Sequence, residues 1–138
     1  MFGSAVHASN AYRRLAVESA ALGADRHQLI SLLFSAALAA IGQARTALAR
    51  GDIGAKALAS SKALRLVDEG LKSAVDRAVG EIGEQLYQLY DYCSRRLLQG
   101  HLRHEDGAYA EVAALIGEID GAWRGIAPKG NATVRRAA

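Results

Sequence analysis

The chain has 138 residues, enough for one hydrophobic core and too few for two. Apolar residues make up 51% of the sequence but aromatic residues only 6%, and the one proline is Pro128, so the composition favours closely packed helices. Three of the 17 basic residues, and none of the 14 acidic ones, lie after residue 126, so residues 1–126 are formally neutral and we expect no nucleic-acid partner.

Three regions follow one another along the chain. Residues 1–24 are small and mixed, with weak apolar spacing near Tyr12, and we expect a mobile arm that holds one short helix. Residues 25–126 carry helical apolar periodicity and are expected to form the folded bundle. Residues 127–138 lack this periodicity and hold all the excess positive charge, which predicts a disordered basic tail.

The first long helix is predicted to begin at Asp25. The Asp25 carboxylate can accept a hydrogen bond from a backbone N–H of the first turn, which has no partner within the helix. Gln28, three residues later, fits the second position of a capping box. Gly51 is expected to end this helix, and Asp52 is expected to cap the N-terminus of the next one. Two adjacent apolar stripes predict a wide buried arc. They are Ile30, Phe34, Ala37, Ile41, Ala44 and Leu48, and beside them Leu29, Leu33, Ala36 and Ala40.

The second helix is predicted over residues 55–78 and the third after Gly80. Charged residues of the second helix, such as Lys56, fall on its predicted solvated face. A break is expected over residues 100–107, with Asp106 as a cap. The faces expected to be buried are Ala57, Leu64, Val67, Leu71, Ala74 and Ala78 in the second helix and Ile82, Leu86, Leu89, Cys93 and Leu97 in the third.

The fourth helix has the most regular pattern, and Pro128 ends it. Short polar breaks between the four helices favour antiparallel neighbours, and no alternating strand pattern competes. The predicted fold is therefore all-α, an antiparallel four-helix bundle with a short, partly helical N-terminal arm. The apolar residues of the fourth helix, spaced three and four apart, are Tyr109, Val112, Ile116, Ile119, Trp123 and Ile126.

Residues that could carry catalysis or bind a metal are few. Cys93 is the only cysteine, which excludes an internal disulfide and a multi-cysteine metal site. His101 and His104 could share a metal on a helix, but they fall in the predicted break, so we expect no metal. No nucleophile–base pair or phosphate-binding loop is present. We therefore expect no enzyme and no cofactor.

The apolar runs are short. None approaches the ~20 residues of a membrane-spanning helix, and the N-terminus lacks the basic-then-apolar pattern of a signal peptide. We therefore expect a cytoplasmic protein without stable membrane insertion.

Two features allow more than one interpretation. A four-helix bundle with an exposed histidine could be a phosphotransfer module, and His27 is the candidate. Because Leu29 opens a buried stripe where such a module needs small and basic residues, a histidine in a first helical turn is the simpler interpretation. Tyr87, Tyr90 and Tyr92 fit a half-buried contact surface as well as an ordinary core edge.

Short motifs recur in order from about residue 11 to residue 126, and Leu89-Tyr-Asp-Tyr92 is the most specific. In order and spacing these motifs resemble FliS, the family of flagellar export chaperones. The chain departs from the family at Arg26, where a proline is usual, at Ser35-Ala36, where Asp-Gly is usual, at Val79-Gly80, and at Cys93. The other matching pieces are Ala11-Tyr12, Val17-Glu18-Ser19, His27-Gln-Leu-Ile30, Leu32-Leu-Phe34, Lys62-Ala63, Gly83-Glu-Gln-Leu86, Arg95-Arg-Leu97, and Glu111-Val112 through Trp123.

The resemblance implies a bundle whose surface groove holds the C-terminal segment of flagellin, prevents premature polymerisation and delivers the subunit to the flagellar export gate. The family's arm, near Tyr12, covers part of the groove and takes part in gate docking. A generic helical adaptor is the other alternative, and a homodimer is left open. We expect the apolar arc of the first helix and the tyrosine-edged third helix to line the groove. Its residues are Leu29, Ile30, Leu33, Phe34, Leu86, Tyr87 and Tyr90.

Overall fold

The computed structural model describes residue 10 and residues 26–126. The rest of the predicted arm, with Tyr12, and the whole predicted tail lie outside the described residues, as do Asp25 and Pro128. The elements are α2 (Arg26–Ala49), α3 (Ile53–Arg65), the π-helix η1 (Leu66–Lys72), the 3-10 helix η2 (Arg77–Val79), α4 (Glu81–Arg103) and α5 (Asp106–Gly125).

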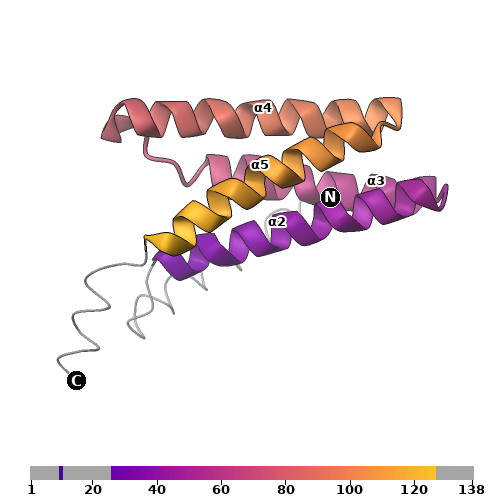
Figure 1. The fold of residues 1–138 in the computed structure, drawn as a ribbon, viewed down its shortest axis with the longest axis horizontal. Coiled ribbons are helices and arrows are strands. Elements are labelled where there is room, and N and C mark those ends of the chain that lie inside the picture. The colour runs from indigo at the N-terminus through magenta and orange to yellow at the C-terminus, as the bar shows by residue number, and fades with distance from the viewer. Residues whose placement is uncertain (1–9, 11–25, 127–138) are drawn as a thin grey trace, which may run out of the picture.

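The four α-helices form a bundle in which each helix has two neighbours. Helix α2 packs on α3 and α5, and α4 packs on the same two, so α2 and α4 are diagonally opposed. Figure 1 shows α5 running from the end of α4 to the start of α2. The described residues contain no strand. The prediction of an all-α four-helix bundle is confirmed for this part of the chain.

Helix α2 has the wide buried arc that the sequence predicts. Phe34, Ala37 and Ile41 are almost wholly buried, and Leu33 from the neighbouring stripe joins them in the core. Among the described residues, α2 is also the one helix whose length and apolarity would allow it to cross a membrane. Because its most apolar stripe faces the bundle core, that composition matches a core helix.

The turn between α2 and α3 confirms the predicted stop and cap. Gly51 has a φ of 70°, a left-handed conformation that glycine adopts without steric cost. The Asp52 carboxylate accepts a hydrogen bond from the backbone N–H of Ala55 at 3.0 Å. The cap fixes where α3 begins, because it satisfies an orphan donor of the first turn.

The second helix is shorter than predicted. Regular α-helix ends at Arg65 and continues as the π-helix η1 only to Lys72. The Asp76 carboxylate then caps η2 through the backbone N–H of Ala78 at 2.9 Å, which draws the chain out of the helical path. Ala78, which was predicted to be buried, is therefore exposed. A second prediction for this segment is also wrong: Lys56, expected on the solvated face, is completely buried.

The break between α4 and α5 is also shorter than predicted. Helix α4 continues through Gly100 to Arg103, and only His104 and Glu105 separate it from α5. A Cβ at Gly100 would lie 3.0 Å from the Ala108 Cβ, so this glycine permits close packing of the two helices and does not interrupt α4. His104 makes the turn with a φ of 52°.

The core ends before the helices do. Ile82 and Ile126, both predicted to be buried, are exposed at the ends of α4 and α5, and Trp123, expected to be mostly buried, is half-buried. Tyr109, Val112 and other predicted residues do fill the interior. The largest apolar side chains that are almost wholly buried are Tyr109, Phe34, Ile41, Leu71, Leu97, Ile116, Val67 and Val112.

Candidate functional site

The seven residues expected to line a groove differ in accessibility. Leu29 on α2 and Leu86 and Tyr87 on α4 are half-buried at the surface. The other four, Ile30, Leu33, Phe34 and Tyr90, belong to the buried core cluster. Helices α2 and α4 are diagonally opposed. The groove candidates on α2 and those on α4 are therefore connected through the core and not along a shared surface. Their joint role as a groove stays a prediction.

The three tyrosines of α4 have different surroundings. Tyr90 is buried, and its burial raises the pKa of its hydroxyl. Tyr87 lies under the guanidinium of Arg77, with the carbon of that group 4.1 Å from the ring centroid. Tyr92 donates a hydrogen bond from its hydroxyl to Glu111 on α5 at 2.7 Å. Tyr87 is half-buried, and its ring joins α4 to η1 and η2 through Lys72 and Arg77.

A third stripe on α2, which was not predicted from the sequence, lies at the surface and includes Leu29 and Ala36 from the predicted buried arc. Its members are spaced alternately three and four residues apart, as on a helix that packs against a partner helix, and none is fully buried. Leu32 lies between the core residues Ile30 and Leu33 in sequence, but it is 56% exposed. The spacing of three and four residues is visible in the sequence, but the two more apolar stripes beside it are the ones that predict burial. The members are Leu29, Leu32, Ala36, Ala39, Gln43 and Thr46.

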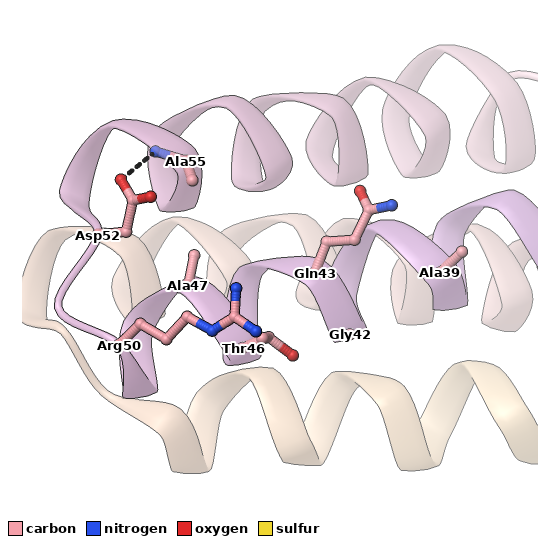
Figure 2. A pocket seen from close by; sticks show the side chains of 8 residues that line it. All are labelled: Ala39, Gly42, Gln43, Thr46, Ala47, Arg50, Asp52 and Ala55. Carbon is pink, nitrogen blue, oxygen red and sulfur yellow. Dashed lines mark hydrogen bonds between the residues drawn. The ribbon is translucent and has the colours of Figure 1, made fainter.

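The stripe leads into a shallow cavity of about 500 Å³ between α2 and the start of α3 (Figure 2). Small side chains form much of its lining, and Gln43, Thr46 and Arg50 add polar groups. Figure 2 shows the Asp52 cap at one end of the cavity. Small residues let the backbone of a partner helix approach closely, so the cavity suits an extension of the same contact. The lining residues are Ala39, Gly42, Gln43, Thr46, Ala47, Arg50, Asp52 and Ala55.

His27 is not placed as a phosphotransfer histidine. It lies in the first turn of α2, half-buried, and its ring stacks on Trp123 with the ring centroids 4.5 Å apart. Its Nε2 lies 2.6 Å from the Trp123 carbonyl oxygen, and the Trp123 indole N–H donates to the His27 carbonyl at 3.0 Å. A ring held by these contacts joins the start of α2 to the end of α5.

The described residues contain no cluster of three or more histidine, cysteine, aspartate or glutamate side chains that could hold a metal. Lys56 Nζ donates to the His101 carbonyl oxygen at 2.8 Å and contacts His104 Nδ1, so the two histidines flank a lysine. Cys93 is buried, and its burial raises the pKa of the thiol to about 11, far from the range of a reactive cysteine.

Known proteins are similar to this chain over most of its length. Residues 8–130 match the family model described as flagellar protein FliS. The flagellar secretion chaperone FliS of Salmonella typhimurium is 47% identical over 120 residues, which cover 86% of this chain and 89% of that protein. The corresponding protein of Escherichia coli is 35% identical over 87% of this chain and 89% of its own length. FliSB of Pseudomonas aeruginosa, also a flagellar secretion chaperone, is 32% identical over 88% of this chain and 97% of its own length. The chain therefore belongs to the FliS family of flagellar secretion chaperones, and it is a chaperone and not an enzyme.

Proposed function

We propose that this chaperone binds the C-terminal segment of flagellin in the cytoplasm, prevents its premature polymerisation and delivers it to the flagellar export gate. The observation that carries the proposal is the third stripe of α2, from Leu29 to Thr46, whose residues are spaced as on a helix that packs against a partner helix but lie at the surface. A segment that folds into a helix on this stripe would bury the exposed Leu32 and cover the cavity beside α3.

The residues predicted to line the groove take two roles in this proposal. Leu29, Leu86 and Tyr87 are accessible enough to contact flagellin directly. The buried members shape the helices that carry them, as Phe34 does under the α2 stripe. Because α2 and α4 are diagonally opposed, a segment that contacts both must pass around the bundle. A chain that is disordered when free can do this.

Binding that is coupled to folding suits a chaperone that must later release its client. Ordering the segment costs part of the interaction energy, so a large apolar contact can give a complex that is specific and still separable. A rigid partner with the same contact would bind more tightly and be harder to release.

The experiment compares two alanine-to-glutamate variants on exposed helical positions. Ala39→Glu places a charge in the middle of the α2 stripe, whereas Ala114→Glu places one on the exposed face of α5. We expect Ala39→Glu to weaken binding of full-length flagellin by at least about tenfold in titration calorimetry, because the charge would be buried against apolar surface. Ala114→Glu and flagellin without its C-terminal segment are the controls.

Two outcomes would contradict the proposal. Flagellin that lacks its C-terminal segment would bind as tightly as the full-length protein, or Ala39→Glu and Ala114→Glu would bind equally well. Retention of no flagellin at all would favour a generic helical adaptor with another client.

The N-terminal arm is proposed to cover the groove and to dock at the export gate through Tyr12. Deletion of residues 1–14 should preserve or raise the affinity for the flagellin segment, because the segment no longer has to displace a cover. The same deletion should weaken binding to the gate. A many-fold loss of flagellin affinity in the folded deletion variant would show instead that the arm is part of the flagellin site.

The free protein is proposed to form a homodimer through surface that flagellin later covers. Sedimentation of the chaperone alone and with the flagellin segment tests this: the dimer should dissociate as the segment is added. A free protein that stays monomeric at high concentration would exclude it.

A further inference from the structure

Positive charge is concentrated in one part of a bundle that is formally neutral as a whole. Residues 53–67 of the second helical segment and residues 92–104 of the third contain no acidic residue but six lysines and arginines. Lys56 is buried, Arg95 pairs with Asp91, and Arg96 pairs with two glutamates. The remaining three are exposed and form no ion pair with another described residue. They are Lys62, Arg65 and Arg103, and of these Arg103, seven residues after Arg96, lies on the side of α4 that faces α5.

The two acid-free stretches lie side by side. Lys56 at the start of α3 reaches the carbonyl oxygen of His101 near the end of α4. At the opposite end of these two stretches, the Ser94 hydroxyl donates a hydrogen bond to the Asp68 carboxylate at 2.6 Å. These contacts give an antiparallel pairing in which residues 57–65 face residues 95–102, so their charges and apolar groups form one surface, which we call the α3–α4 face.

Leucines are exposed on the same face. Leu58 on α3 is 77% exposed, and on α4 Leu98 is 45% and Leu102 67% exposed. Leu98 and Leu102 are four residues apart, so they project from the same side of α4. Between Leu58 and Arg65 on α3 lies Ser61, a small exposed residue. The face therefore has apolar side chains on two neighbouring helices, separated by a small residue, and a third helix could pack across them.

We propose that the α3–α4 face binds an acidic amphipathic helix of a second partner protein, separately from the flagellin segment on α2. The leucines contact its apolar side, and Lys62 and Arg65 contact its acidic flanks. Two such cations on this face are fewer than the roughly 4–8 that mark a binding site for anionic lipid, and fewer than nucleic-acid contacts of comparable size require. Exposed leucines in two rows also fit a helix better than a phosphate backbone.

The test uses the full chain and a synthetic probe. The probe is a fluorescent helical peptide of about 20 residues, with leucine along one side and glutamate on the other. In fluorescence anisotropy we expect it to bind at least about tenfold more tightly than the same peptide with lysine in place of glutamate, and binding should weaken as salt is raised. Leu98→Gln and Arg65→Glu should each weaken binding about tenfold. Ile82→Gln is the matched control, because Ile82 is also an exposed residue of α4 but lies near its other end.

The following results would overturn the proposal. The two peptides would bind equally well, or Ile82→Gln would weaken binding as much as Leu98→Gln. Phosphatidylserine vesicles or a single-stranded oligonucleotide would bind more tightly than the acidic peptide and displace it. The flagellin C-terminal segment would displace the peptide, which would make the α3–α4 face part of the flagellin site. Simultaneous binding of peptide and flagellin supports the proposal, and loss of flagellin binding alone would concern only the proposed function.

Discussion

The two ends of the bundle are held together in different ways. At the closed end, where α2 turns into α3 and α4 into α5, buried side chains make the contacts. Ser60 and Tyr109 share a buried hydrogen bond of 2.7 Å, and the buried Lys56 donates from Nζ to the carbonyl oxygen of the half-buried His101. At the open end, where α2 begins and α5 ends, the half-buried pair of His27 and Trp123 joins the helices.

The comparison shows where the bundle can adapt to a partner. At the closed end, short connections and buried polar bonds leave little freedom, because breaking one leaves an unpaired polar group in the interior. At the open end, water can replace the lost contacts of a half-buried ring. We therefore expect changes at the closed end to cost more stability, and changes at the open end to be better tolerated.

The largest effect is expected from Gly100→Val at the closed end. A Cβ there would lie 3.0 Å from the Ala108 Cβ and 3.2 Å from the Tyr109 ring, so the larger side chain would separate α4 from α5. We expect a loss of about 3 kcal/mol in the free energy of unfolding, measured by urea denaturation. Gly121→Val is the control, since nothing lies within 4 Å of its Cβ position. Equal losses in both would show that helix α4 is not packed closely at Gly100.

At the open end, Trp123→Ala should cost about 2 kcal/mol, less than a fully buried tryptophan because the ring is half-exposed. The substitution removes the stack on His27 and the indole hydrogen bond to its carbonyl. Ile126→Ala, three residues later and exposed, should change stability by less than about 0.5 kcal/mol. A stability of Trp123→Ala equal to wild type would mean that the open end is held by other contacts.

The two capping aspartates give a smaller test of the same comparison. Asp52→Ala removes the cap of α3, a helix of 13 residues at the closed end, and should cost about 1 kcal/mol. Asp76→Ala removes the cap of η2, which has only three residues, and should cost less than half as much. Thermal unfolding of the two variants in parallel measures the difference, and the reverse order would contradict it.

The smallest effects concern pH, and the two ends should respond in different ranges. Burial, with the nearby charges of Lys56 and His104, lowers the pKa of His101 below 6.5. The unfolded chain then binds the proton more readily, so this contribution to stability is complete above pH 6.5 and is lost as the pH falls through the lower pKa of the folded state. At the open end, hydrogen bonds from Arg77 and Gln88 lower the pKa of Glu84 from 4.5 to about 2, so its contribution is lost only between these values.

Unfolding followed from pH 7.5 to pH 3 separates the two contributions. His101→Gln should flatten the decline just below pH 6.5 and leave the decline below pH 4.5 unchanged. Glu84→Gln should do the opposite. A His101→Gln variant whose stability follows the wild-type curve throughout would show that His101 protonation does not affect folding.

Much of the fold could be predicted from local patterns. The stop at Gly51, the Asp52 cap and the regular apolar spacing of α2 and α5 each depend on neighbours in sequence, and the structure confirms them. The predicted groove residues were chosen for the same apolar spacing, and this explains why Phe34 and Tyr90 are core residues. Periodicity identifies a face that must be covered, but it does not say whether the cover is another helix of the chain or a partner.

The sequence alone determined that residues 26–126 form four amphipathic helices, because helical periodicity and caps are local properties. The tertiary structure decided which faces remain free. It placed Lys56 inside, since the carbonyl oxygen of His101 on α4 can satisfy its ammonium group, and it made Gly100 a packing position, since α5 approaches α4 there. It also set the leucines of α3 and α4 on one face. These outcomes depend on contacts between residues more than 40 positions apart or on different helices, which no local pattern contains.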